Sequence, residues 1–430
     1  MKPQNKFYFY LFLSAIIFIS GCAPDHIYRN VYNECISTLD NTCVEHSIQI
    51  HDQDKNSEYQ LSFVEIDDQG QLRDRKQMKA LLDQIYKVAA FDNVLLNVFV
   101  HGWHHNAAPG DSNIDGFKEN LRKLSLIEHQ YSQDNKYKPR KVIGIYVGWR
   151  GESIDFPGLR YTTFWDRKST AEDVGYLGIS ELLLKLEEVT NVKNTQPPKF
   201  RSRLVIIGHS FGGAVVYNAS SQILASRFIN SKPGKNFSGA VQGFGDLIVL
   251  LNPAFEAAQF SPLYDLAQAR CSYLGSKKPR LAILTSETDY ATKYAFSAGR
   301  IFSTFLETHN TVEREECNGK RKLILDEGDA DRTTVGHFEP LLTHTLTLAD
   351  TNEATQKSKT DPSPMTWNQQ QQETSHQYGN MILTHLEKTA MYNPYLNIQV
   401  SQEIMDGHND IFGDNLMDFI RMLIISSTND

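Results

Sequence analysis

A serine between two glycines follows an apolar run and could act as a nucleophile. Residues 204–207 are apolar, Gly208-His209-Ser210-Phe211-Gly212 comes next, and small, helix-compatible residues follow. A strand, a sharp turn and a helix would hold the Ser210 hydroxyl above a sheet, beside the free N–H groups of the helix. A side chain at either glycine would collide with the neighbouring strand or helix. The pattern predicts a nucleophile elbow; the alternative is a plain Gly-rich turn.

A serine needs a base to remove its proton, and the base needs a carboxylate to hold its tautomer. Asp289 ends the acidic turn that follows apolar residues 281–284, and we favour it as the acid. Glu287 is a close competitor and Glu256 a distant one. Either carboxylate of the turn could instead cap the next helix.

A histidine that could act as the base lies on the loop before the last predicted helix. Residues 405–410 read Met-Asp-Gly-His-Asn-Asp, between a strand-like segment at 396–400 and an amphipathic helix at 411–425. We therefore predict His408 as the general base. The rival is His337, which also follows a glycine.

Alternating strands and helices must position these residues. Apolar strands are predicted at 59–66, 94–100, 141–147, 204–207, 247–251 and 281–284, and helices at 73–90, 114–126, 171–190, 214–225 and 264–269. Continuously apolar strands that alternate with helices predict an α/β fold with a mostly parallel central sheet flanked by helices. The rhythm breaks in a large insertion at about 292–394, before the last strand. The insertion contains a stretch of low hydropathy at 351–375, and it is expected to be a lid, a binding element or a disordered loop.

Together these motifs resemble the alpha/beta-hydrolase-fold serine esterases of the bacterial lipoprotein type. The motifs are GHSFGG at 208–213, HGW at 101–103, TSETD at 285–289 and DGHND at 406–410, and the resemblance covers about 59–425. It implies an alpha/beta-hydrolase domain over 58–430, acting on carboxylic esters through an acyl-serine intermediate without a cofactor. It also implies an oxyanion hole from the backbone N–H groups of Phe211 and Trp103. The HGGG form of the oxyanion loop, found in some lipases, is absent.

The N-terminus resembles an export signal with a bacterial lipobox. Lys2 and Lys6 precede an apolar core at 7–19 that is too short to span a bilayer comfortably. Ile-Ser-Gly-Cys at 19–22 predicts a signal peptide over 1–21 and lipid on Cys22; the alternative is an ordinary signal with a coincidental cysteine. Ala23 favours the outer membrane in such proteins. Residues 22–57 are expected to form a tether and N-terminal extension.

Net charge and cysteine content bear on the binding partners, disulfides and metal sites of the chain. Removing 1–21 takes away two lysines and no acid, so the formal net charge falls from −8 to −10, which argues against nucleic acid as a partner. The four later cysteines suggest the disulfides Cys35–Cys43 and Cys271–Cys317. No metal site is expected, because the adjacent His104 and His105 would point apart.

Two aromatic-basic clusters, at 149–151 and 165–168, could contact an anionic substrate, although salt bridges within the domain are favoured. Three functions are compatible with the sequence. The first is a membrane-anchored serine hydrolase acting on a small-molecule or lipid ester in the cell envelope. The second is an acyltransferase or thioesterase with the same triad, and the third is a non-catalytic, partner-binding lipoprotein on the same fold.

Overall fold

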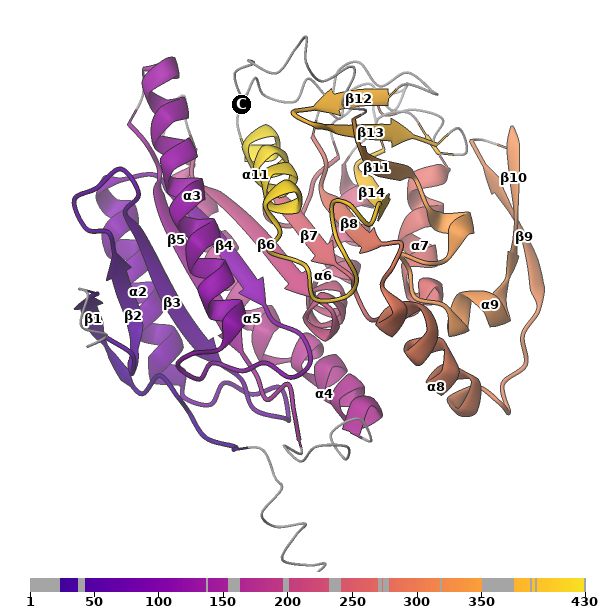
Figure 1. Cartoon of the computed structure of the whole chain (residues 1–430), viewed down its shortest axis with the longest axis horizontal. Coiled ribbons are helices and arrows are strands. Elements are labelled where there is room, and N and C mark those ends of the chain that lie inside the picture. The colour runs from indigo at the N-terminus through magenta and orange to yellow at the C-terminus, as the bar shows by residue number, and fades with distance from the viewer. Residues whose placement is uncertain are drawn as a thin grey trace, which may run out of the picture.

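The computed structural model describes residues 24–37, 43–136, 138–153, 163–195, 201–231, 241–269, 273, 278–317, 319–349, 375–386, 389–390 and 393–428. The described part is an α/β structure in which helices flank one large, mostly parallel sheet (Figure 1). The predicted signal peptide, Cys22, Cys271 and most of the stretch at 351–375 lie outside the described residues.

The strands of this sheet lie in the order β1-β2-β3-β5-β4-β6-β7-β8-β14-β11-β13-β12. Every neighbouring pair from β3 to β11 is parallel. The carboxyl ends of those strands therefore lie along one edge, termed here the carboxyl edge. The bounds in chain order are β1 (Val31–Ile36), β2 (His46–His51), β3 (Tyr59–Glu65), β4 (Val94–Val100), β5 (Lys141–Gly148), β6 (Arg203–His209), β7 (Leu247–Leu251), β8 (Leu281–Ser286), β11 (His344–Leu348), β12 (Ser375–Tyr378), β13 (Met381–His385) and β14 (Tyr395–Val400).

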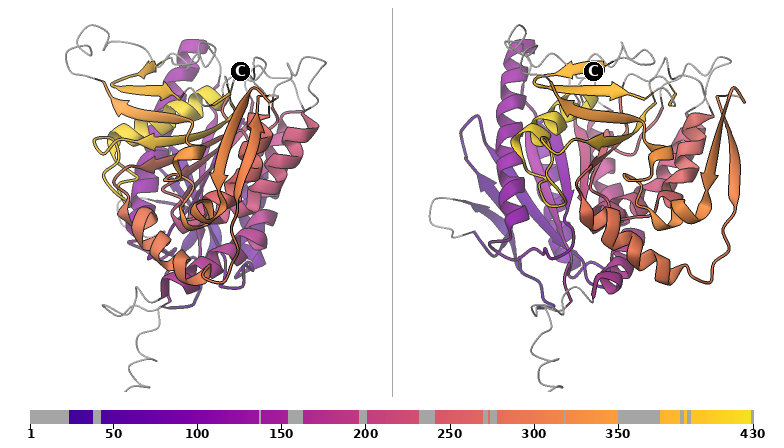
Figure 2. Two further views of the ribbon diagram at one scale, coloured as in Figure 1. Left: turned by 90° about the vertical axis from the view of Figure 1, so that its right-hand side faces the viewer. Right: turned by 45° about the vertical axis from the view of Figure 1, so that its right-hand side comes forward.

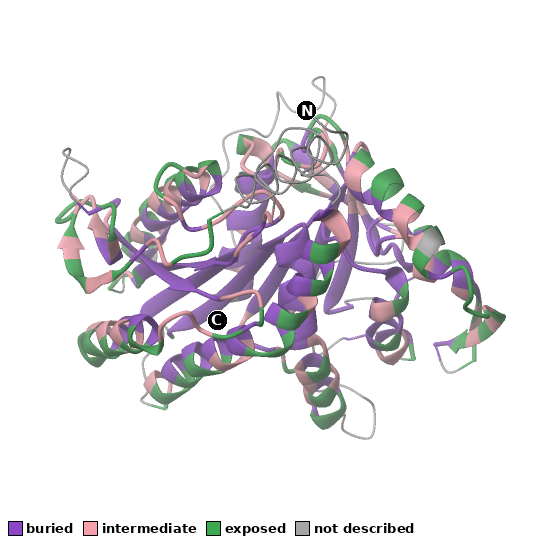
Figure 3. Ribbon diagram, turned by 90° about the horizontal axis from the view of Figure 1, so that it is seen from below, coloured by how far each residue is buried: buried purple, intermediate pink, exposed green. Residues whose placement is uncertain are grey.

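Helices cover both faces of the sheet because its strands are apolar on both. Along β4, Leu96 and Val98 belong to one buried cluster, while Leu95 and Phe99 belong to the other. In Figure 1, α3 (Ser112–Asn135) and α11 (Asp414–Thr428) lie in front of the sheet. The other cluster is completed by α2 (Arg75–Phe91), α4 (Phe164–Tyr176), α5 (Gly178–Lys193), α6 (Phe211–Asn230) and α7 (Ala257–Gln268). Figure 3 shows the buried sheet between helices whose outer faces are exposed.

The helix predicted over 171–190 is in fact two helices, α4 and α5. They meet at Leu177, whose φ of −114° and ψ of −105° are not helical. The N–H of Gly178 donates to the carbonyl oxygen of Gly70 at 2.6 Å, and a Cβ at Gly178 would lie 2.5 Å from that oxygen. The turn at Gly70 therefore packs against the chain where the helix is interrupted. The sequence of residues 171–190 does not indicate this contact.

Part of the segment expected to form a tether builds the sheet. β1 pairs in parallel with β2, and β2 pairs antiparallel with β3, so both strands extend one edge. β1, at the edge, is half-exposed or exposed along its length, which suits its polar composition, whereas β2 is partly buried. The predicted disulfide Cys35–Cys43 is confirmed, with an S–S distance of 2.01 Å. The pairing of Cys271 with Cys317 stays a prediction.

The insertion extends the opposite end of the sheet. β11 pairs in parallel with β14, and β13 and β12 follow in antiparallel pairs. Before them come the short π-helix η2 (Ala291–Ala295), α8 (Phe296–Ser303), a hairpin of β9 (Thr311–Glu316) and β10 (Arg321–Asp326), and α9 (Glu327–Arg332). Figure 2 shows these elements gathered at the β14 side of the molecule.

Candidate active site

Ser210 stands at the sharp turn between β6 and α6. Its φ of 55° and ψ of −122° form a strained conformation that non-glycine residues seldom adopt. The turn requires its glycines, since a Cβ at Gly208 would lie 2.5 Å from the Gly212 carbonyl oxygen. A Cβ at Gly212 would lie 2.1 Å from the carbonyl oxygen of Val100 on β4. The predicted elbow geometry is therefore present, and it holds Ser210 at the carboxyl edge.

Three residues from loops at this edge form a hydrogen-bonded relay. Ser210 Oγ lies 2.8 Å from His408 Nε2, and His408 Nδ1 lies 2.8 Å from Asp289 Oδ2. Ser210 follows β6, Asp289 follows β8, and His408 follows β14. The structure thus brings together the three residues that the sequence analysis selected, from positions up to 198 residues apart.

The Asp289 carboxylate is fully buried and accepts several hydrogen bonds. Oδ1 accepts the backbone N–H groups of Ala291 and Thr292, each at 3.1 Å, and Oδ2 accepts the Thr292 hydroxyl at 2.5 Å. Burial opposes ionisation, but the bonds from His408 and Thr292 outweigh it and lower the pKa of Asp289 below its ordinary value. Because an ionised carboxylate only accepts, His408 carries its proton on Nδ1 and turns the lone pair of Nε2 toward Ser210.

The competing acids and base occupy other positions. Glu287 is exposed and accepts the N–H of Gln402 at 3.0 Å. Glu256 is buried against Lys168 and Arg300, each at 3.0 Å. Neither carboxylate contacts His408 in the described hydrogen bonds.

His337, the rival base, lies behind the relay. Its Nε2 is 3.1 Å from the Thr292 hydroxyl, which in turn bonds Asp289. Burial lowers the pKa of His337 to about 4, so the ring is neutral near pH 7. It therefore supports the acid and does not reach Ser210 directly.

Asn252, which the sequence analysis missed, holds the His408 loop. It follows β7 with a φ of 44°, and its Nδ2 donates to the carbonyl oxygens of Gly407 and His408 at 3.0 and 2.9 Å. Its Oδ1 accepts the N–H of Ser286 at 2.9 Å. One buried amide thus links the loops after β7, β8 and β14. The sequence feature that could have indicated Asn252 is its position as a polar amide directly after the apolar strand β7.

The loop after β4 approaches the nucleophile closely. A Cβ on Gly102 would lie 2.7 Å from the Cβ of Ser210 and 3.0 Å from the His209 carbonyl oxygen. Trp103 is therefore the residue next to this contact. Phe211 is the first residue of α6, so its N–H has no acceptor within that helix. Their roles as oxyanion donors stay predictions.

Aromatic side chains form a wall beside this loop. The Trp103 and Phe164 rings meet edge to face at 5.2 Å, and Phe164 lies 4.9 Å from the ring of Phe211. Trp103 and Phe164 are half-buried, whereas Phe211 is fully buried. The half-buried rings of Trp103 and Phe164 thus give this loop an apolar surface, packed on the residue that follows Ser210.

The adjacent histidines pair with different carboxylates. His104 Nδ1 lies 2.8 Å from Glu152, and His105 Nδ1 lies 3.1 Å from Asp111. Neither of these two pairings was predicted from the sequence. Among the described residues, one group has ligand atoms close enough together to hold a metal ion, and it comprises Glu307, His309 and Asp331 in the insertion.

The aromatic-basic clusters form salt bridges within the domain. Arg150 and Arg167 both pair with Asp68, the latter at 3.0 Å. Lys168 pairs with Glu172 at 2.5 Å as well as with Glu256. These pairings agree with the favoured interpretation.

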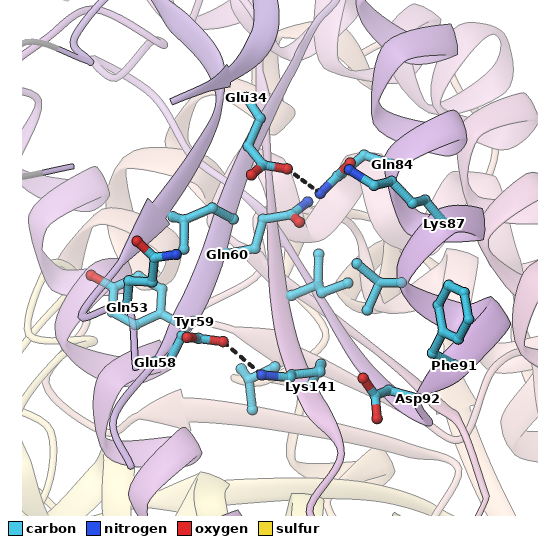
Figure 4. Close-up of a pocket in the computed structure, with 14 residues that line it drawn as sticks. Glu34, Gln53, Glu58, Tyr59, Gln60, Gln84, Lys87, Phe91, Asp92 and Lys141 are labelled. Carbon is cyan, nitrogen blue, oxygen red and sulfur yellow. Dashed lines mark hydrogen bonds and ion pairs between the residues drawn. The ribbon is translucent and has the colours of Figure 1, made fainter. Parts of the chain in front are cut away.

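A cavity of about 340 Å³ lies at the amino ends of the strands, opposite the relay (Figure 4). Its walls include the first residues of β3 and β5 and the last turn of α2. Two of its carboxylates are paired, Glu58 with Lys141 at 2.7 Å and Glu34 with Gln84 at 2.5 Å. None of the residues that line it belongs to the relay, so it is separate from the candidate site.

Comparisons of the chain with protein-family models, with curated proteins and with solved structures found no match. No helix within the described ranges has both the length and the hydropathy needed to span a bilayer.

Proposed function

We propose that this chain is a serine hydrolase that cleaves carboxylic esters through an acyl-serine intermediate. The observation that carries the proposal is the relay Ser210–His408–Asp289, with both hydrogen bonds at 2.8 Å. The strained elbow and the order serine, acid, histidine along the chain add support for an alpha/beta-hydrolase fold. A nucleophile, a base and an orienting acid in mutual contact are what acyl transfer requires.

In the proposed mechanism, Ser210 Oγ attacks the ester carbonyl carbon while His408 Nε2 takes the serine proton. Asp289 stabilises the resulting imidazolium, and the N–H groups of Phe211 and Trp103 hold the oxyanion. The ester C–O bond breaks, the leaving alcohol takes the proton from His408, and the acyl group stays on Ser210. Water then gives its proton to His408 and attacks the acyl carbon. The acid departs and Ser210 regains its proton.

We further infer that lipid on Cys22 anchors the protein in a bacterial envelope, with the outer membrane favoured by Ala23. This proposal rests on the sequence of residues 1–23 alone. The acidic net charge supports a lipid anchor over a polybasic one.

Fluorophosphonate labelling followed by mass spectrometry of the modified peptide tests the hydrolase proposal. We expect an adduct on Ser210 that is lost in Ser210→Ala and in His408→Ala. Ser226→Ala is the matched control, because Ser226 is exposed on the same helix, α6, and should leave labelling unchanged. A folded wild-type protein that hydrolyses no short ester and takes no label would overturn the proposal.

A further inference from the structure

An exposed apolar stripe begins directly after the proposed catalytic acid. It comprises Tyr290, just before η2, Tyr294 on η2, Ile301 on α8, and Phe305 and Leu306 just after α8. Their exposed fractions run from 53% for Ile301 to 80% for Phe305 and 90% for Leu306. The two tyrosine rings stack at 5.8 Å. Scattered apolar residues are normal on a protein surface, but five within 17 residues make this segment a candidate contact surface.

The stripe is the face that this segment turns away from the core. Phe296 is fully buried, and its ring lies 5.9 Å from Trp165 of α4. Gly299 packs so closely that a Cβ would meet the Trp165 ring at 1.8 Å. Thr292 and Thr304 are buried as well. The packed face is thus occupied by α4 and the site, and the stripe is left exposed.

The N-terminal end of the described chain lies at the same edge as this stripe. Tyr28 donates its N–H to Glu65 at the carboxyl end of β3, at 2.9 Å, and Arg29 Nε donates to the Ala107 carbonyl oxygen at 2.8 Å. Pro24 lines a small cavity with Trp149, which directly follows β5. In Figure 1 the indigo segment before β1 and the helix α8 both lie at the lower edge.

The predicted anchor therefore lies at the same edge of the sheet as the candidate site. Pro24 is two positions after Cys22, a reach of about 7 Å in an extended chain. Lipid on Cys22 would hold the carboxyl edge against the bilayer rather than away from it. The relay, the stripe and the anchored end would then face the same lipid surface.

We propose that the apolar stripe docks on a lipid bilayer and that the substrate is an ester of an amphiphile taken from that bilayer. The substrate class rests on the proposed hydrolase function, whereas the docking does not. Tyrosines suit the headgroup region, and the more exposed Phe305 and Leu306 suit the acyl boundary. Because the chain is acidic, the contact is apolar rather than electrostatic and needs no anionic lipid. A bilayer is favoured over a protein partner because the anchored end places one within reach.

Depth measurement tests the docking without reference to catalysis. The full chain is bound to phosphatidylcholine vesicles, with a nitroxide on Phe305→Cys or on Phe91→Cys. Phe91 is the matched control, since it is an aromatic residue 83% exposed at the opposite end of the strands (Figure 4). We expect the label at 305 to be accessible to oxygen and shielded from a water-soluble nickel chelate, and the label at 91 to show the reverse. Both labels in water would overturn the docking.

Hydrolysis rates then test the substrate class. The double variant Phe305→Asp, Leu306→Asp should lose roughly tenfold or more of the rate on a long-chain ester embedded in the vesicles, since two large apolar side chains no longer enter the lipid. It should keep the wild-type rate on a soluble acetate ester, and Phe91→Asp should keep both rates. Equal rates on the vesicle ester for wild type and double variant would overturn the substrate class. A lipid-buried label at 305 in a protein inactive on both esters would leave the docking intact and refute the hydrolase proposal.

Discussion

Replacing Asp289 by asparagine should reverse the donor and the acceptor in the hydrogen bond to His408 while keeping the positions of the side chains. Oδ1 accepts two backbone N–H groups, so the amide oxygen of the substituted side chain must occupy that position. The amide NH₂ then takes the place of Oδ2 and points at His408 Nδ1, 2.8 Å away. A donor there forces Nδ1 to accept, and the His408 proton moves to Nε2. His408 can then no longer accept the proton of Ser210.

The expected loss follows from this tautomer change. In serine-protease triads the same change lowers kcat by about 10⁴-fold, equivalent to about 5.4 kcal/mol of barrier at 1.36 kcal/mol per tenfold. The fold should tolerate Asp289→Asn, because the Thr292 hydroxyl can rotate to accept from the amide. Replacing a charge-assisted hydrogen bond by a neutral one costs about 1 kcal/mol of stability.

The assay is hydrolysis of a soluble ester at pH 8, with thermal unfolding as the check on folding. Glu287→Gln is the matched control: it is two residues away in the same turn and is exposed, so we expect its rate to stay within about twofold of wild type. A folded Asp289→Asn protein that kept a tenth of its activity would refute the reasoning. So would a large loss in Glu287→Gln, which would make Glu287 the acid.

Three further substitutions probe the surroundings of the relay. Thr292→Val removes the hydroxyl that donates to Asp289 at 2.5 Å, so the carboxylate becomes more basic. We expect kcat/KM to fall about tenfold and the acid limb of its pH profile to move to higher pH. Thr292→Ser keeps the hydroxyl and should keep the wild-type profile. Gly102→Ala places a methyl group 2.7 Å from the Ser210 Cβ, so fluorophosphonate labelling should slow at least tenfold, and unchanged labelling would show that the loop moves freely. Burial lowers the pKa of His101 to about 4, so this ring stabilises the fold above pH 6.5 and loses its contribution as the pH falls toward 4; the loss is about 2 kcal/mol at pH 5. His101→Gln, in which an amide oxygen can replace Nε2 as the acceptor for Trp149, should flatten that part of the urea-denaturation profile between pH 7 and 5, and an unchanged slope would contradict the assignment.

The three relay residues could be predicted because each lies in the loop that follows an apolar strand. Ser210, Asp289 and His408 come after β6, β8 and β14, and parallel strands bring their carboxyl ends to one edge. Strand direction explains why these loops meet, whereas the choice of Asp289 over Glu287 and of His408 over His337 also drew on the resemblance to alpha/beta-hydrolases. The same logic gave the mostly parallel core of the sheet.

Residues that act through tertiary contacts could not be predicted in this way. Thr292 and Asn252 matter because their side chains point at groups on other loops, and sequence spacing says nothing of that direction. The break between α4 and α5 depends on Gly70, more than 100 residues earlier. The edge strand β1 is polar and half-exposed or exposed along its length, so the hydropathy that reveals central strands is missing there.

The acid and the stripe share one segment, and this decides where the docking variants should be made. Apart from the bond to His408, the hydrogen bonds that hold the Asp289 carboxylate come from Ala291 and Thr292, in the turn that begins η2. Tyr290 and Tyr294 flank that turn, so a substitution at either position would lie beside the donors to the acid. Phe305 and Leu306 lie beyond the far end of α8, so their substitution leaves the donors in place. A rate that falls on the vesicle ester alone therefore measures contact with lipid rather than damage to the relay.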